Sequence, residues 1–306
     1  MKGLVLKSTG SWYVVRKEDG GLLRARLRGK FKNKGLKLSN PVAVGDHVTL
    51  ELEGEEGSAV ITEIGKRRNH IIRKSIHKTA HAHIIASNLD QAFLVVTLVS
   101  PRTSFGFIDR FLVTAEAYHI PVTLLFNKID LYDEDTLKYQ ERVRNMYRQI
   151  GYESVVCSAA EGIGIEEIQQ LLDKKVTLFS GHSGVGKSTL VNALVPDLDL
   201  KTTEISAFSD KGVHTTTFAE MFEIGPETYL IDTPGIKELG IVDIPKEELG
   251  GLFPEFRPFM AECRFNNCLH LKEPGCKVLE AVEAGKISLT RFDSYKSILE
   301  GDDNRR

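Results

Sequence analysis

The chain begins with short segments in which apolar and polar positions alternate with the period of a β-strand. Between residues 23 and 28 this alternation puts Leu or Ala on one face and Arg24, Arg26 and Arg28 on the other. Similar runs, separated by turns with Gly, Asn or Pro, occur at residues 12–15, 48–52 and 59–64. About five such strands around a small core predict an all-β, OB-like barrel over residues 1–65, a fold that often binds oligonucleotides.

The pattern changes at residue 66. Residues 66–88 are predicted to be a polar linker. Beyond them, apolar runs at 92–96, 122–126, 154–157 and 176–179 alternate with segments whose apolar residues recur at i, i+3, i+4 and i+7. Strands that alternate with helices predict a parallel sheet covered on both faces, an α/β domain over residues 66–240. Residues 241–306 show no strand pattern and are predicted to be a helical domain. The chain is thus expected to be multidomain.

Composition is that of an ordinary globular protein, with 42% apolar and 27% charged residues among 306. No apolar run approaches the roughly 20 residues that cross a bilayer. The apolar part of the N-terminus is too short for a secretory signal. Three of the four cysteines crowd near the C-terminus, which is not the pattern of a disulfide framework. We therefore expect a cytoplasmic protein without a membrane contact, and nothing requires more than a monomer.

Charge is distributed unevenly along the chain. Residues 1–80 hold 17 Lys and Arg against 8 Asp and Glu, whereas the remainder holds 23 against 34. A basic N-terminal part favours a nucleic-acid contact there. The candidate RNA-binding residues are Arg24, Arg26, Arg28, Lys30 and Lys32. The alternative is that these charges only keep a small domain solvated.

A phosphate-binding loop follows the apolar run at 176–179. Residues 181–188 read Gly-His-Ser-Gly-Val-Gly-Lys-Ser, the G-x-x-x-x-G-K-[ST] pattern, and a helical segment comes next. In such a loop backbone N–H groups surround phosphates, Lys187 reaches the β- and γ-phosphates, and Ser188 binds Mg²⁺. The predicted phosphate-binding residues are Gly181, His182, Ser183, Gly184, Val185, Gly186, Lys187, Ser188 and Thr189.

Two later segments complete this pattern. Asp232-Thr233-Pro234-Gly235 ends an apolar run, so that Asp232 can help to hold Mg²⁺ and Gly235 can donate its N–H to the γ-phosphate. Between the two motifs lies a threonine run, residues 215–217, with Thr216 in its middle. One of these hydroxyls, taken as Thr216, is expected to complete the Mg²⁺ shell, although the sequence does not distinguish the three. The alternative is a threonine-rich turn before a strand.

Base selection is predicted for Asn127-Lys128-Ile129-Asp130, directly after the run at 122–126. The Asp130 carboxylate can accept hydrogen bonds from N1–H and the N2 amino group of guanine, a donor pair that adenine lacks. Ser158 and Ala159 follow the next apolar run, where the Ala159 N–H can meet guanine O6. The predicted ligand is therefore GTP or GDP, with Mg²⁺.

Three cysteines and one histidine form a second candidate site. Cys263, Cys268, His270 and Cys276 lie within 14 residues. Thiolate and imidazole ligands suit a tetrahedral, structural Zn²⁺, with no position left for a catalytic water. The alternative is a set of buried free cysteines. Cys157 stands apart and is interpreted as a small packed residue.

The five nucleotide motifs resemble those of the Ras-like GTPase superfamily, but the base motifs precede the phosphate loop, which indicates a circular permutation. With the basic barrel and the Cys/His cluster, nearly the whole chain resembles the bacterial ribosome small subunit-dependent GTPase A family. That resemblance implies a late role in maturation of the small ribosomal subunit. It also implies GTP hydrolysis accelerated by the subunit, and ribosomal RNA contacts from the barrel and zinc domains.

Ile236 occupies the position where many Ras-like enzymes carry a water-orienting Gln, which predicts slow intrinsic turnover. His214 is hypothesised to orient the water when the ribosome orders its loop; the alternative is a surface histidine. A second reading of the function is an RNA-binding module that uses GTP as an occupancy switch, with hydrolysis incidental. An unrelated P-loop kinase is a third, which Asn127 and Asp130 disfavour.

Overall fold

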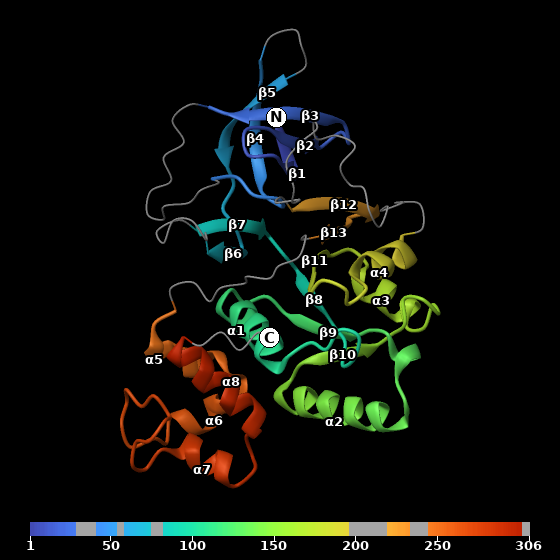
Figure 1. Ribbon diagram of the computed structural model, residues 1–306. Coiled ribbons are helices and arrows are strands. Elements are labelled where there is room, and N and C mark those ends of the chain that lie inside the picture. The colour runs from blue at the N-terminus through green and yellow to red at the C-terminus, as the bar shows by residue number, and fades with distance from the viewer. Residues whose placement is uncertain (29–40, 54–57, 75–81, 196–218, 233–243, 302–306) are drawn as a thin grey trace.

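The computed structural model of the protein describes residues 1–28, 41–53, 58–74, 82–195, 219–232 and 244–301. Figure 1 shows a small β-barrel near the N-terminus, a central layer of strands flanked by helices, and a group of helices near the C-terminus. This is the multidomain arrangement that the hydrophobic patterns predict.

The barrel closes because its first strand has a partner on each side. The strands pair in the order β1 (Lys2–Ser8), β2 (Tyr13–Lys17), β3 (Leu22–Leu27), β5 (Ser58–Ile64) and β4 (His47–Glu53), and β4 pairs back with β1. Alternate residues, among them Val5, Val15 and Leu50, fill the interior. The OB-like barrel is confirmed, and β1 adds a strand that the periodicity did not single out.

Residues 66–88, expected to be a linker, contain two paired strands. Strand β6 (His70–Lys74) pairs antiparallel with β7 (Ala82–Ser87). Ile71, Ile72 and Ile84 are buried. The guanidinium of Arg67 donates to both carboxylate oxygens of the buried Asp46, at 2.7 and 2.6 Å, and so fixes the start of this segment to the barrel.

The central domain is built on a sheet with the spatial order β10-β9-β8-β11-β13-β12. The strands are β8 (Gln91–Val96), β9 (Val122–Phe126), β10 (Glu153–Val156), β11 (Val176–Gly181), β12 (Glu220–Gly225) and β13 (Thr228–Asp232). All pairings are parallel except that of the edge strand β12 with β13. Every residue of β8 is buried, as expected for a central strand with both faces covered.

Helices cover both faces of this sheet. One apolar core packs α1 (Phe105–Ala117) and α2 (Glu134–Ile150) against it. A second core packs α3 (Ile165–Leu172) and α4 (Lys187–Leu194). A short 3₁₀ turn, η1 (Ile129–Leu131), follows β9. The connections place both the 181–188 loop and Asn127 at the carboxyl edge of the sheet.

The C-terminal domain is a cluster of short helices and one longer one. Its elements are α5 (Lys246–Leu249), η3 (Gly250–Leu252), η4 (Pro254–Phe256), α6 (Arg257–Met260), α7 (Lys277–Glu283) and α8 (Leu289–Glu300). Phe253 and Phe256 stack in its core, and Tyr295 meets both rings edge to face, with ring centroids 5.0–5.4 Å apart. Val113 of α1 shares that core, so the domain packs directly on the α/β domain.

The barrel joins the central sheet through its edge strand. Lys7 of β1 pairs with Glu220 of β12 in the strand ladder, and the Lys7 Nζ lies 3.0 Å from the Glu220 carboxylate. Arg16 of β2 forms an ion pair with Glu223 and donates to the Tyr229 hydroxyl at 2.9 Å. Within the described part of the chain, no helix is long and apolar enough to span a bilayer.

Candidate nucleotide site and metal centre

Four parallel strands end at one edge of the sheet, and each is followed by a predicted motif. Asn127 comes directly after β9, and Ser158 is the second residue after the end of β10. Gly181 is the last residue of β11, and Asp232 is the last residue of β13. Ligands of open α/β sheets bind outside the carboxyl ends of the strands, where the chain order switches direction. That switch lies between β8 and β11, beside the phosphate loop.

Glycine is required at two positions of the phosphate loop. Gly186 and Gly181 have φ of +92° and +151°. A Cβ on Gly186 would lie 2.5 Å from Asn127 Nδ2, and one on Gly181 would lie 2.5 Å from the Val95 carbonyl oxygen. Gly184 also has a positive φ, but its nearest neighbour would be Pro101 at 3.5 Å. The loop therefore approaches its neighbours more closely than any side chain allows.

Lys187 begins helix α4 and folds back over the loop. Its Nζ donates to the carbonyl oxygens of Gly181 and His182 at 2.7 and 2.8 Å. Burial lowers the pKa of the ammonium group, and the nearby Asp232 carboxylate opposes that shift. A positive charge is thus held at the helix N-terminus, where unpaired backbone N–H groups also favour an anion.

The other loop residues divide into exposed and packed ones. Ser183, Ser188 and Thr189 are exposed, whereas Val185 is fully buried. The His182 ring packs on Phe107 of α1 with centroids 3.8 Å apart. The two serine hydroxyls are therefore available to a ligand, and His182 and Val185 hold the loop to the domain.

Asn127 ties the base motif to the phosphate loop. Its buried Nδ2 donates to the Val185 carbonyl at 2.9 Å, and its Oδ1 accepts from the Ala159 N–H at 3.0 Å. Three motifs far apart in the sequence are thereby joined through one side chain. The Ala159 N–H, predicted to meet guanine O6, donates to Asn127 in this structure, and its role toward a base stays a prediction.

Asp130 and Lys128 lie at the rim of this edge. Asp130 is exposed, and the Ser158 hydroxyl donates to its carboxylate. Lys128 has φ +66° and donates its Nζ to the Ser100 carbonyl at 2.6 Å. A carboxylate held at the rim by a hydroxyl can accept two hydrogen bonds from a base.

Several predicted residues lie outside the described part of the chain. They are His214, Thr216, Gly235, Lys30 and Lys32. Of the predicted Mg²⁺ ligands, Ser188 and Asp232 lie in the described part of the chain. One offers a hydroxyl and the other a carboxylate beside Lys187, and oxygen ligands of this kind suit a small hard cation.

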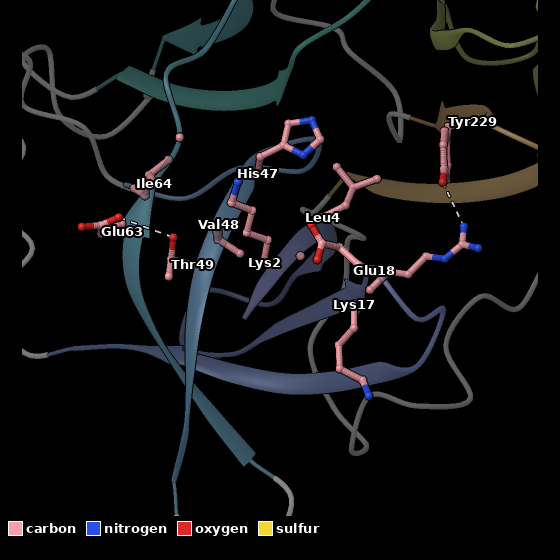
Figure 2. A pocket seen from close by; sticks show the side chains of 13 residues that line it. Lys2, Leu4, Lys17, Glu18, His47, Val48, Thr49, Glu63, Ile64 and Tyr229 are labelled. Carbon is pink, nitrogen blue, oxygen red and sulfur yellow. Dashed lines mark hydrogen bonds between the residues drawn. The ribbon is translucent and has the colours of Figure 1, made fainter.

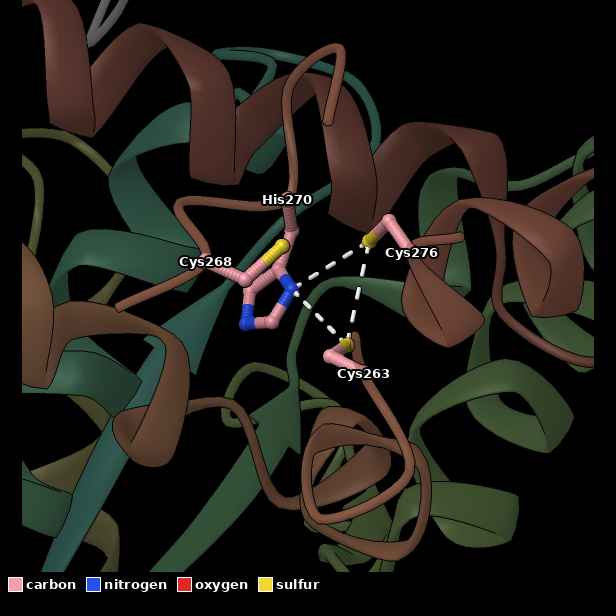
Figure 3. A group of neighbouring side chains, drawn as sticks. All are labelled: Cys263, Cys268, His270 and Cys276. Atoms are coloured by element: carbon pink, nitrogen blue, oxygen red, sulfur yellow. Dashed lines mark hydrogen bonds between the residues drawn. The ribbon is translucent and has the colours of Figure 1, made fainter. Parts of the chain in front are cut away.

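The four candidate zinc ligands come together as predicted (Figure 3). Their ligand atoms all lie within 4.8 Å of one another. His270 Nδ1 is 3.7 Å from Cys263 Sγ and 3.4 Å from Cys276 Sγ, and these two sulfurs are 4.0 Å apart. A tetrahedral zinc site requires roughly 3.8 Å between two sulfurs and roughly 3.5 Å between sulfur and nitrogen. The donor set and its spacing therefore fit a tetrahedral metal.

The loop around the cluster is shaped by Glu273 and Cys276. The Glu273 carboxylate accepts from the backbone N–H groups of Leu269 and Leu271 at 3.0 and 2.8 Å. Burial raises the pKa of Glu273, but these backbone donors outweigh it and bring the value to about 2. Cys276 caps helix α7 with its sulfur. Burial also raises the pKa of Cys268 to about 12, so a cation is needed to keep that thiol ionised.

On the barrel, acidic partners reduce the predicted basic face. The Arg26 guanidinium donates two hydrogen bonds to the Glu53 carboxylate, at 2.9 and 2.6 Å, and the Arg28 guanidinium lies 3.5 Å from the Glu51 carboxylate. Arg24 has no acidic partner among the residues that the structure describes; its guanidinium lies over the exposed Trp12 ring, 5.2 Å from the centroid. The alternating run Glu51-Leu52-Glu53 on β4 was the sequence signal for these partners.

A cavity of about 600 Å³ lies at the opposite side of the domain (Figure 2). It opens between the barrel and the amino end of β13, where Tyr229 faces Arg16. Basic and acidic residues both line it, among them Lys2, His47 and Glu63. None of the motif residues contributes to it, so it is separate from the nucleotide edge.

Comparison with known proteins agrees with this geometry. The family model described as RsgA GTPase matches residues 64–242, and the RsgA N-terminal domain model matches residues 2–61. The small ribosomal subunit biogenesis GTPase RsgA of Bacteroides fragilis is 54% identical over 300 residues, which cover 98% of this chain and 96% of that protein. Its counterpart in Flavobacterium psychrophilum is 53% identical over 305 residues, covering 99% and 94%.

Two solved structures share the whole architecture. The crystal structure of YjeQ from Thermotoga maritima superposes with a TM-score of 0.78 at 36% identity, covering 100% of this chain and 99% of that one. The structure of YloQ, described as a circularly permuted GTPase, gives 0.74 at 30% identity, covering 100% and 96%. The permuted motif order is therefore shared with known structures.

Proposed function

The chain belongs to the RsgA GTPase family, and on that premise we propose that it hydrolyses GTP while bound to the small ribosomal subunit and assists the late maturation of that subunit. It is a GTP-hydrolysing enzyme with a circularly permuted α/β domain. The proposal concerns where it acts and which residues act there. The proposal is supported by the names of the protein's relatives and by the geometry at the carboxyl edge of the sheet.

The observation that carries the nucleotide assignment is the contact network of Asn127. This side chain bonds the phosphate loop at Val185 and the base-side loop at Ala159; the first bond is buried and the second is partly buried. Such a link holds the phosphate and base positions at a set distance from each other, as recognition of a whole nucleotide requires.

We assign the site residue by residue on this basis. Asp130 selects guanine, with Asn127, Lys128, Ser158 and Ala159 shaping the base side. The phosphate side consists of residues 181–189, Asp232 and Gly235. The Mg²⁺ that GTPases use generally would be held by Ser188, Thr216 and Asp232, and it neutralises phosphate charge when bound.

This chain's residues then favour attack of water on the γ-phosphate by position and charge. Lys187 holds its ammonium group at the helix N-terminus, and backbone N–H groups of the loop present further positive ends to the phosphates. Ile236 supplies no hydrogen bond to orient the water. We propose that intrinsic turnover is slow and that His214 orients the water when the subunit orders its segment.

The remaining domains are assigned to binding. Cys263, Cys268, His270 and Cys276 hold one structural Zn²⁺, which stabilises the helical domain. The barrel contacts ribosomal RNA. Arg24 and Trp12 are the pair most available for that contact, because Arg26 and Arg28 form ion pairs with acidic residues. Lys30 and Lys32 would add phosphate contacts. A cytoplasmic monomer is consistent with this role.

The test is GTP turnover with and without purified small ribosomal subunits, with ATP as the control nucleotide. We expect strong stimulation for GTP alone, which fades as salt rises because basic contacts release counterions from RNA. Ser188→Ala should abolish stimulated turnover. Stimulation that is absent although GTP binds would reject the ribosomal assignment. A variant that binds GTP, does not hydrolyse it and still supports maturation would favour the occupancy switch.

A further inference from the structure

One row of charged residues runs from the barrel to the nucleotide edge across three strands. Lys7 on β1 is the ladder partner of Glu220 on β12, and Glu220 is the ladder partner of Asp232 on β13. The Lys7 Nζ lies 3.0 Å from the Glu220 carboxylate. At the other end of the row, the Asp232 carboxylate interacts electrostatically with the Lys187 ammonium group of the phosphate loop.

Strand geometry places these three side chains on one face. Directly opposed residues of an antiparallel pair project to the same side, with Cβ atoms roughly 5 Å apart. Glu220 and Asp232 are therefore two carboxylates in direct opposition, an arrangement that destabilises a sheet unless a cation balances it. Lys187 lies on the Asp232 side of this pair, and Lys7, which comes from another domain, is the cation that contacts Glu220.

We propose that Lys7 is a positioning residue for the Mg²⁺ site: it neutralises Glu220, so that Asp232 stays at its place at the end of β13. Docking of the barrel is thereby linked to how well the nucleotide site holds its metal. The inference rests on the proposed role of Asp232.

The same interface contains a matched control. Arg16 on β2 forms an ion pair with Glu223 on β12, but the ladder partner of Glu223 is Tyr229, not a carboxylate. Loss of Arg16 removes a barrel–sheet ion pair of the same kind and leaves no charge opposite Asp232. If the two ion pairs only hold the barrel to the sheet, loss of either pair should change the Mg²⁺ dependence equally. If Lys7 positions Asp232, only loss of Lys7 should change it.

The experiment compares Lys7→Met, Glu220→Gln, the double variant and Arg16→Met. Dissociation of a fluorescent GDP analogue is measured over a Mg²⁺ titration, and GTP turnover is measured in parallel. We expect Lys7→Met to raise the half-saturating Mg²⁺ concentration about five-fold, because repulsion between the uncompensated Glu220 carboxylate and the directly opposed Asp232 carboxylate moves Asp232 away from the metal position. Glu220→Gln and Arg16→Met should stay within about two-fold. The double variant should return to the wild-type value.

Two results would overturn the inference. One is an unchanged or lowered half-saturating Mg²⁺ concentration in Lys7→Met. The other is a double variant as impaired as Lys7→Met, since that pattern belongs to simple loss of an ion pair. Failure of the underlying assignment has a different signature: Asp232→Asn would then leave the Mg²⁺ dependence of GDP dissociation unchanged. Thermal unfolding of each variant separates these effects from loss of folding.

Discussion

At the scale of single residues, the nucleotide edge depends on backbone that only glycine can adopt and on one amide side chain. Gly186 faces Asn127, and Asn127 in turn bonds to the loop that Gly186 terminates. A side chain at residue 186 would displace the Asn127 amide. The displaced amide would no longer pair with the Val185 carbonyl and the Ala159 N–H. Buried groups without partners cost about 1–3 kcal/mol each.

We therefore predict that Gly186→Ala weakens GDP binding at least ten-fold. The added Cβ would lie 2.5 Å from Asn127 Nδ2 in a backbone with φ +92°. Overpacking of this kind costs about 1–3 kcal/mol. Gly184→Ala is the matched control, since its φ is +82° but its nearest contact would be 3.5 Å away. Equilibrium titration with a fluorescent nucleotide measures both, and equal losses would show that backbone strain alone is responsible.

At the scale of elements, helix α8 is held to the α/β domain by a buried charge cluster. The fully buried Arg291 lies 2.6 Å from Asp109 of α1 and 2.6 Å from Glu255 of η4. Tyr147 of α2 donates to the same Asp109 at 2.8 Å. Burial lowers the pKa of Arg291, but the two carboxylates outweigh this and raise it well above its ordinary value. The guanidinium is therefore charged at any pH at which the protein is folded.

Arg291→Met is predicted to lower the free energy of unfolding by about 3–5 kcal/mol, because it leaves two buried carboxylates without their cation. The control is Arg257→Met, which removes an exposed pair with Glu116 and should cost less than about 1 kcal/mol. Urea unfolding followed by circular dichroism measures both. Similar midpoints for the two variants would contradict the importance of the buried cluster.

At the scale of the whole molecule, the barrel and the helical domain contact the α/β domain at different places. The barrel contacts the edge strand β12, and the helical domain packs on α1. The Cys/His cluster lies within the helical domain's own core, and no residue of the cluster belongs to the nucleotide edge. Stability of the helical domain and nucleotide binding are therefore expected to be separable.

Removal of zinc by a strong chelator should lower the melting temperature and abolish cooperative unfolding of the helical domain, since a structural metal contributes folding energy directly. GDP affinity should stay within about two-fold. Zinc content provides the residue control: Cys268→Ser should lose the metal, whereas the separate, buried Cys157→Ser should keep it. A loss of GDP binding that parallels zinc loss would show that the two domains are coupled.

Local patterns in the sequence identified most of the residues of the candidate site. Strand and helix periods identify the domains, and the phosphate loop, the base motif and the Cys/His cluster follow from short spacings. These features are local because a loop that binds phosphate or zinc needs its ligands on adjacent backbone. The paired strands β6 and β7 and strand β1 were missed because their apolar residues are few and flanked by polar ones.

Only the tertiary structure decided which distant residues meet. Asn127 bonds Val185 across 58 residues, and Lys7 pairs with Glu220 across 213. Glu53 and Glu51 neutralise two arginines that the barrel pattern had assigned to RNA. The physical reason is that strand order and register determine such contacts, and the period of a strand shows which face a side chain occupies but not which strand lies beside it.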